Sequence, residues 1–261
     1  MTVNIHADII KSRQLLSLGN ASDAKKLLDR ICREEKTNID ALFLLSAANG
    51  QLGLFREVIT CCEQVIRLRP DIAPAHVNMA NALSALGRHE EAAISYDRAL
   101  RIRPEDHACL NNYGHALFHA GKQEDAIEIF RKAILAKPDY SEAHHNLANA
   151  LEVAGQYEPA INHYREAIRI NPRSMESRHK LGDCLRELGR LEAAEACYLE
   201  TLEFCKEAES GRTLWSLAVL RRYQGRLDEG KCFGTCRAYQ CCQRQYVHTR
   251  RTQILDSWWS H

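Results

Sequence analysis

Histidine is the residue type whose spacing most resembles a site for chemistry in this sequence. His115 and His119 lie four residues apart, and His145 follows in a later segment. Two histidines at that spacing share one face of a helix and could ligate a metal ion. No carboxylate or thiol completes the set, and histidine is equally common on surfaces that bind peptides. We therefore predict no metal site.

Two further patterns resemble catalytic motifs. Residues 225–231 begin like a phosphate-binding loop, but Cys232 stands where Ser or Thr would hold magnesium. Neighbouring carboxylates such as Glu90 and Glu91 fall at the starts of expected helices, where they complement the helix dipole. No nucleophile-elbow, zinc-protease or dinucleotide-binding motif occurs. The sequence therefore predicts neither catalysis nor a cofactor.

The composition is that of a folded protein without a bias toward nucleic acid. Apolar residues make up 45% of the 261 residues, and 35 Lys and Arg against 34 Asp and Glu leave a net charge of +1. A phosphate backbone attracts a clear basic excess, so nucleic acid is not an expected partner. The N-terminus lacks the apolar segment of a signal peptide, and no apolar run approaches the ~18 residues that span a bilayer. Eleven scattered cysteines suit a reducing compartment, so we predict a cytoplasmic protein without membrane contact.

Proline and glycine recur with a period of 34 residues, and this period decides the fold class. The recurring residues are Pro70, Pro104, Pro138 and Pro172, with Gly19, Gly53, Gly87, Gly121, Gly155 and Gly189. Apolar residues between them follow helical spacing, as in the helices expected over residues 75–86 and 90–103. Gly87 suits the left-handed conformation that closes the first of these helices, and Pro104 ends the second. Each unit of 34 residues is therefore expected to be a helical hairpin.

Small and aromatic residues recur at fixed places within the units. Three units carry a small residue, an alanine, an aromatic residue, a second alanine and a proline in that order: Ala80, Ala92, Tyr96, Ala99 and Pro104; Gly114, Ala126, Phe130, Ala133 and Pro138; Ala148, Ala160, Tyr164, Ala167 and Pro172. This pattern resembles the tetratricopeptide-repeat family. The resemblance implies an all-α fold, a right-handed superhelical solenoid of antiparallel helix pairs with about six to seven repeats.

The repeats are placed from this register. We expect them at residues 5–38, 39–72, 73–106, 107–140, 141–174 and 175–208, with a partial unit at 211–229, so that the solenoid covers residues 5–228. The outer units match the pattern less well, as terminal repeats do when one face meets water.

In this family the first helix of each repeat lines a concave groove, and the fifth, sixth and ninth residues of the repeat face it. These places are apolar in the first two repeats, with Ile9, Ile10, Phe43, Leu44 and Ala47, and include the polar residues Asn111 and His179 further along. The resemblance implies a groove that binds peptide, and the residues predicted to bind are Asn78, Asn81, Asn112, His115, His145, Asn146, Asn149, Lys180 and Asp183.

Asn78, Asn112 and Asn146 are again 34 residues apart. An amide both donates and accepts hydrogen bonds, so a ladder of amides can bind the backbone of an extended peptide whatever its side chains. This ladder resembles the one in the superhelical repeat region of O-linked N-acetylglucosamine transferases and their SPINDLY-like relatives. Nothing of their catalytic domain is recognisable here.

Another subfamily binds the acidic C-termini of chaperones with a clamp of two asparagines and three cations. Asn81 and Asn112 match the asparagines, but the basic places hold Val77, Glu142 and Asn146. Without these cations, a bound carboxylate would lose its hydration and gain few charge-assisted hydrogen bonds in exchange. The sequence therefore disfavours an acidic chaperone C-terminus as the ligand.

The last part of the sequence, residues 230–261, departs from the repeat. It is basic and holds Cys232, Cys236, Cys241 and Cys242, with His248 beyond, at a spacing that fits no common zinc knuckle. Two hypotheses stay open: the coding frame shifts near Gly230, or the segment is a divergent basic cap.

These observations favour a non-catalytic scaffold that binds an extended segment of a partner protein in its groove. The alternative is the substrate-recognition repeat region of a larger glycosyltransferase or sulfotransferase whose catalytic domain is missing. A structural subunit that self-associates through the edges of its repeats is the third possibility.

Overall fold

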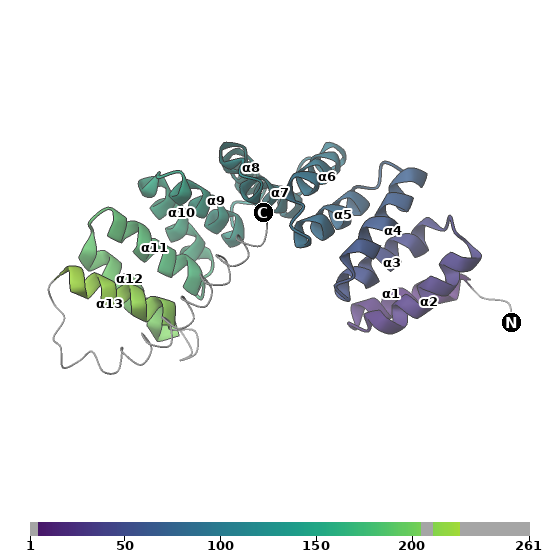
Figure 1. The fold of residues 1–261 in the computed structure, drawn as a ribbon, viewed down its shortest axis with the longest axis horizontal. Helices are drawn as coiled ribbons and strands as arrows, with labels where there is room; N and C mark the ends of the chain where they lie inside the picture. The colour runs from purple at the N-terminus through teal and green to yellow at the C-terminus, as the bar shows by residue number, and fades with distance from the viewer. Residues whose placement is uncertain (1–4, 205–210, 225–261) are drawn as a thin grey trace, which may run out of the picture. The chain divides into compact units, whose positions relative to one another are not determined.

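The computed structural model describes residues 5–204 and 211–224, and every described element is an α-helix. The chain divides into two compact units, which meet in sequence between Pro138 and Asp139. The first unit contains α1 Ile5–Ser17, α2 Ala21–Glu34, α3 Ile39–Gln51, α4 Phe55–Leu68, α5 Ala73–Ala85, α6 His89–Ile102, α7 His107–His119 and α8 Gln123–Ala136 (Figure 1). The second contains α9 Ser141–Val153, α10 Tyr157–Ile170, α11 Met175–Glu187, α12 Leu191–Phe204 and α13 Gly211–Tyr223.

Within each unit, successive helices pair into antiparallel hairpins that stack on the next hairpin (Figure 1). The predicted all-α fold of helix pairs is therefore confirmed. None of the described helices is long and apolar enough to cross a membrane.

A glycine in the left-handed conformation closes the first helix of each of the first six hairpins. The φ angles lie between +71° and +78° at the six glycines predicted for this role, from Gly19 to Gly189. At Gly87 the glycine N–H donates to the Ser84 carbonyl at 3.0 Å, and the N–H of Arg88 donates to the Leu83 carbonyl at 2.9 Å. This pair of bonds satisfies carbonyls that the helix end leaves without a partner.

In four repeats a proline stands two residues after the last residue of the second helix and prevents the helix from continuing. α4, α6, α8 and α10 end at Leu68, Ile102, Ala136 and Ile170. The residue before each proline is held out of the helical conformation, as at Arg103, where φ is −131° and ψ is 84°. The next helix starts with a side-chain cap in some repeats, as where Asp106 accepts from the Cys109 N–H at 3.0 Å.

In two repeats a glycine in the first helix makes room for an aromatic ring of the following second helix. A Cβ added to Gly114 would lie 2.7 Å from two carbons of the Phe130 ring, and one added to Gly182 would lie 2.6 Å from the Tyr198 ring. Phe130 is 1% exposed. The ring therefore occupies the space that a side chain on the first helix would need, as expected where helices cross closely.

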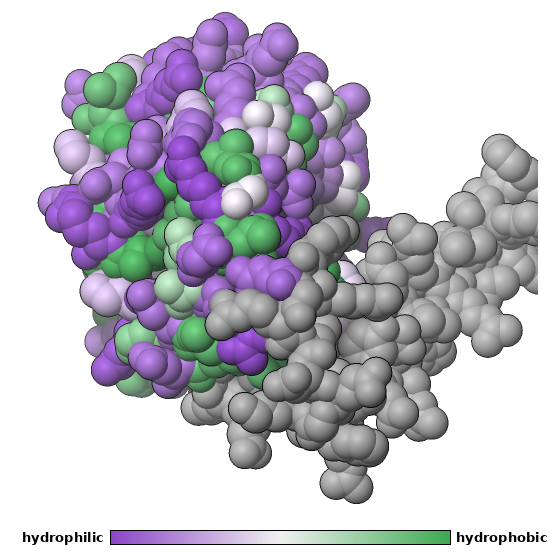
Figure 2. Space-filling model, turned by 90° about the vertical axis from the view of Figure 1, so that its left-hand side faces the viewer, coloured by the Kyte–Doolittle hydropathy of each residue, from purple (hydrophilic) through white to green (hydrophobic). Residues whose placement is uncertain are grey.

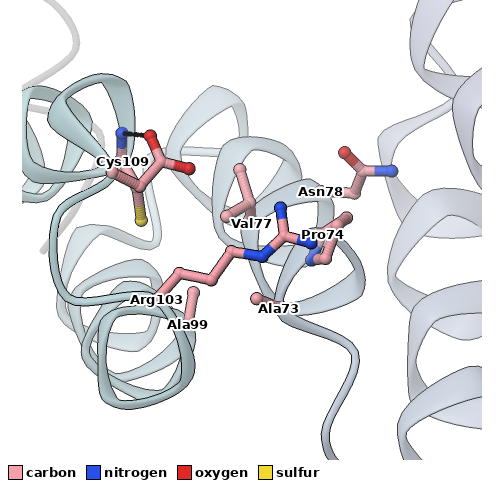
Figure 3. Close-up of a pocket in the computed structure, with 8 residues that line it drawn as sticks. Ala73, Pro74, Val77, Asn78, Ala99, Arg103 and Cys109 are labelled. Atoms are coloured by element: carbon pink, nitrogen blue, oxygen red, sulfur yellow. Dashed lines mark hydrogen bonds between the residues drawn. The ribbon is translucent and has the colours of Figure 1, made fainter.

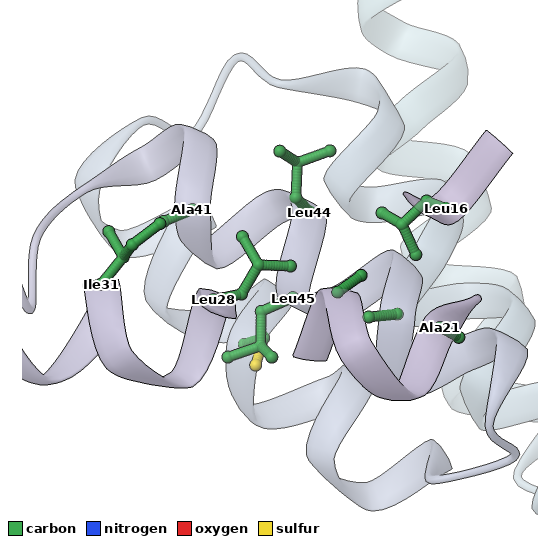
Figure 4. Close-up of a cluster of buried hydrophobic side chains, with 10 residues drawn as sticks. Leu16, Ala21, Leu28, Ile31, Ala41, Leu44 and Leu45 are labelled. Atoms are coloured by element: carbon green, nitrogen blue, oxygen red, sulfur yellow. The ribbon is translucent and has the colours of Figure 1, made fainter. Parts of the chain in front are cut away.

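The apolar core of the first unit starts at its N-terminal end. Figure 4 shows Leu16, Leu28, Ile31 and Leu45 as members of one buried cluster contributed by α1, α2 and α3. Leu28 and Ile31 are fully buried although their repeat departs from the consensus. The face of the second unit that Figure 2 shows is mainly hydrophilic, with small scattered apolar patches. Hydrophobic burial between hairpins is what stabilises each stack.

Candidate functional site

A polar hollow of about 210 Å³ lies in the first unit, between the first helices α5 and α7. It is lined by Asn81, Ser84, Tyr96, Asn112 and His115. Asn81, Asn112 and His115, which were predicted to bind peptide, thus share one hollow. The two other lining residues, Ser84 and Tyr96, come from the same repeat as Asn81. Asn81 and His115 are exposed and Asn112 is half-buried, so solvent or a ligand can reach them.

The amide of Asn81 is oriented by two donors. Its Oδ1 accepts from the Tyr96 hydroxyl at 2.5 Å and from Nδ2 of Asn112 at 3.5 Å. Burial raises the pKa of Tyr96 to about 12, so this hydroxyl keeps its proton and donates. With its oxygen engaged, Asn81 offers Nδ2 to the hollow, while Asn112 keeps Oδ1 as an acceptor. The hollow therefore presents one amide donor and one amide acceptor.

Asn78 belongs to a different hollow. Its Nδ2 donates to Oγ of Ser46 in the preceding repeat at 3.2 Å, and Ser46 donates onward to the Phe43 carbonyl at 2.6 Å. Asn78 lines a second hollow together with Val77 and Arg103. Asn78 and Asn112 are spaced as predicted along the chain, but they line two separate hollows.

Histidines gather at the end of α7 near the polar hollow. Nε2 of His115 lies 3.1 Å from Nε2 of His119, and the His89 ring stacks on His119 with centroids 5.1 Å apart. Burial, and then the charge of His89, lower the pKa of His119. No group of three or more His, Cys, Asp or Glu side chains that could hold a metal ion occurs in the described ranges. His145 lies in the second unit and is considered there.

In the second unit, the predicted residues are held by internal hydrogen bonds and ion pairs. Nδ1 of His145 lies 2.9 Å from Oγ of Ser177, and burial lowers the histidine pKa. Lys180 pairs with Glu152 at 3.0 Å, and the other oxygen of Glu152 accepts from the Tyr164 hydroxyl at 2.7 Å. Asn146 and Asn149, on α9, are half-buried.

Asp183 is the centre of the other network of the second unit. It accepts from the Tyr198 hydroxyl at 2.7 Å and lies 3.9 Å from the Arg186 guanidinium and 3.4 Å from Nε2 of His179. His179 is 3% exposed, and its Nδ1 lies 3.1 Å from the hydroxyl of Thr213 on α13. Burial lowers the pKa of His179 to about 4, so the ring is neutral near pH 7.

Three residues expected to face the groove are buried, and one of them is Leu44, which is at the sixth place of its repeat and 8% exposed. Asn111 is 1% exposed and His179 is 3% exposed, both at the fifth place of their repeats. His179 contacts the first helix of the next hairpin through Thr213, which explains its burial. The prediction that these residues face the groove is wrong at all three positions.

The described cysteines are poor nucleophiles. Cys32, Cys61, Cys62, Cys109, Cys184 and Cys197 are free and buried or half-buried. Burial raises the pKa of Cys62 to about 12, so its reactive thiolate form is scarce near neutral pH. The loop at residues 225–231 and the cysteines from Cys232 to Cys242, with His248, lie outside the described residues.

Comparison with known proteins identifies the repeat. Three family models described as tetratricopeptide repeat match residues 71–134, 141–174 and 163–196. A search of curated proteins found no match to this sequence.

Solved structures share the fold at low sequence identity. A crystal structure of MamA is 18% identical, covers 63% of this chain and 96% of its own, and superimposes with a TM-score of 0.59. MamA 41-end from Desulfovibrio magneticus RS-1 is 20% identical, covers 65% of this chain and 96% of its own, with a TM-score of 0.62. YrrB, described as a TPR protein with an unusual peptide-binding site, is 14% identical, covers 72% of this chain and 96% of its own, with a TM-score of 0.62. Residues 71–134 and 141–196 thus match the tetratricopeptide repeat, and the solved structures show the same fold.

Proposed function

We propose that this chain is a non-catalytic scaffold that binds an extended segment of a partner protein along the first helices of its repeats. The observation that carries the proposal is the polar hollow of the first unit, where Asn81 and Asn112 offer a donor and an acceptor side by side. An extended peptide backbone presents a carbonyl and an N–H in alternation, so it can satisfy both amides.

The chemistry of the groove residues favours recognition over reaction. The hydroxyl of Tyr96 keeps its proton, and the described cysteines are shielded from solvent to differing degrees. Lys180 and Asp183 are engaged by neighbours of opposite charge. Groups held in this way can orient a ligand through fixed hydrogen bonds, and no pair of them is placed as a nucleophile with its base.

The relatives support the same class of function. Tetratricopeptide repeats stack into surfaces that hold other proteins, and YrrB is described as having a peptide-binding site of its own. We extend this to a protein or an extended peptide as the partner, with neither nucleic acid nor a membrane as ligand. A net charge of +1 and the many free thiols fit this partner and a cytoplasmic location.

The test is affinity capture with the full chain as bait, comparing wild type with the triple variant Asn78→Ala, Asn112→Ala and Asn146→Ala. Each lost amide contact removes about 1 kcal/mol of binding, so the triple variant is expected to bind its partner about 100-fold more weakly. Asn162→Ala, at an exposed position of the second helix α10, is the matched control.

Two results would contradict the proposal. One is equal capture of the same partner by wild type and the triple variant, which would place the binding surface elsewhere. The other is capture of nothing but further copies of the chain, which would favour self-association through the repeat edges. A partner segment that competes as a synthetic peptide supports groove binding.

A further inference from the structure

A second hollow in the first unit, of about 130 Å³, differs from the polar hollow in charge. Its walls are largely apolar and its rim carries one amide, one guanidinium and one carboxylate; the lining residues are Ala73, Pro74, Val77, Asn78, Ala99, Arg103, Asp106 and Cys109 (Figure 3). We propose that this hollow accepts the side chain of an Asp or Glu in the bound peptide, with Arg103 pairing its carboxylate. This inference rests on the proposed function.

The position of Arg103 follows from the end of α6. Pro104 keeps Arg103 out of the helical conformation, so the side chain leaves the helix axis and extends across the hollow toward Pro74 and Val77 (Figure 3). The aliphatic part of an arginine can lie along such an apolar wall while its guanidinium stays near water. Arg103 thereby brings a permanent positive charge to the rim of the hollow.

Arg103 has no hydrogen bond or ion pair from its side chain within residues 5–204 and 211–224, in contrast to its neighbours. Arg69, at the same place in the preceding repeat, lies 3.7 Å from Asp71. Arg101 pairs with Asp97 at 2.8 Å. A guanidinium forms its strongest contacts with a carboxylate that it can bind through two parallel hydrogen bonds, and Arg103 retains all its donors for such a ligand.

Asn78 fixes how a peptide would enter this hollow. Because Nδ2 of Asn78 donates to Ser46, its Oδ1 is left to accept a hydrogen bond from a ligand. A peptide residue whose backbone N–H donates to Asn78 can direct its side chain past Val77 toward Arg103. The volume of about 130 Å³ leaves room for the four or five heavy atoms of an Asp or Glu side chain.

Asp106 is the one lining residue whose charge opposes an acidic ligand, and its carboxylate is already compensated. Its Oδ1 accepts from the Cys109 N–H at 3.0 Å, at the N-terminal end of α7, where the helix dipole is positive. The alternative occupant is a basic side chain that pairs with Asp106. Arg103 would repel it, so the charges of the rim favour the acidic side chain.

The experiment selects peptides from a phage-displayed library of random 12-residue sequences on the immobilised full chain. The wild type is expected to enrich Asp or Glu at one aligned position. Arg103→Glu is expected to lose that enrichment, or to replace it with Lys or Arg. Arg101→Glu, which changes a paired and exposed arginine two residues away, is the matched control and should select like the wild type.

A synthetic peptide from the selection then tests the pairing directly. Changing its acidic residue to the amide is expected to weaken binding to the wild type at least 10-fold, and to have no further effect on Arg103→Gln. Enrichment without an acidic position, or with a basic one, overturns the acidic subsite while peptide binding stands. Failure of the wild type to select any peptide overturns both the subsite and the proposed function.

Discussion

Gly114 is a glycine inside a helix whose replacement by alanine should destabilise the protein, against the usual rule. Alanine is favoured over glycine within a helix by about 1 kcal/mol. At Gly114, however, the new Cβ would lie 2.7 Å from two ring carbons of Phe130 and 3.0 Å from a third. Phe130 is 1% exposed, so its ring has little room to move. Overpacking of this kind costs about 1–3 kcal/mol.

The sum of these two effects predicts that Gly114→Ala lowers the free energy of unfolding by about 1 kcal/mol. Gly50 offers a control, because it lies in the last turn of the first helix α3 and its added Cβ would meet only Val58, at 3.9 Å. Gly50→Ala gains the helix preference without a clash, and we expect it to stabilise the protein by about 0.5–1 kcal/mol. The two variants should therefore shift the unfolding midpoint in opposite directions.

The assay is urea unfolding of the full chain followed by far-ultraviolet circular dichroism, with variants compared at equal m-values. A double-mutant cycle with Phe130→Leu tests the cause, since removal of the ring opens the space above Gly114. In that background Gly114→Ala should become neutral or stabilising. If Gly114→Ala stabilises the wild-type chain as much as Gly50→Ala does, the ring does not confine this position and the reasoning is refuted.

Three further predictions concern the turns and the networks. Gly121→Ala places a Cβ on a residue in the left-handed conformation, at φ +78°, and should lower the free energy of unfolding in urea by about 1–2 kcal/mol. Asparagine tolerates this conformation better than alanine, so an equal loss in Gly121→Asn would contradict the backbone explanation. His179 should make stability depend on pH: its folded pKa, about 4, lies below its ordinary value of 6.5, so its contribution is complete above pH 6.5 and is lost as the pH falls toward 4. The loss amounts to at most about 3 kcal/mol, and it should be absent from His179→Gln when the midpoints of both proteins are followed between pH 4 and 7.5. Tyr96→Phe removes the donor to Asn81 and should cost about 1 kcal/mol of stability while weakening capture of the partner; unchanged capture would mean that the orientation of Asn81 does not matter for binding.

The fold could be predicted from the sequence because the repeat uses local signals. A glycine that must adopt positive φ and a proline that cannot continue a helix mark the ends of the helices, and both act within a few residues. Their spacing of 34 residues then fixes the register of every hairpin.

The site was only partly predictable, because it depends on contacts between hairpins. The register indicates which face of a first helix points away from its own second helix, but not which residues the next hairpin covers. His179, which contacts Thr213 of the next hairpin, is buried for this reason. Arg103 was missed because it lies outside the first helices of the repeats. The sequence around it indicates only that the second helix ends before a proline. The sequence signal there is a basic residue before a proline, and because Arg69 before Pro70 has the same signal, it does not single out Arg103.

Two tyrosines of the second helices, Tyr96 and Tyr198, link the interior to the groove in a way that bears on how specificity evolves. The hydroxyls of Tyr96 and Tyr198 each reach the ninth residue of their own repeat, Asn81 and Asp183, whereas Phe130 has no hydroxyl to offer His115. An exchange between tyrosine and phenylalanine hardly changes the packing of the ring. It does change whether the side chain of the ninth residue is held by a hydroxyl, and therefore which of its atoms faces the groove. Related proteins with identical surface residues could for this reason prefer different partners, and sequence surveys that compare only exposed positions would overlook the cause.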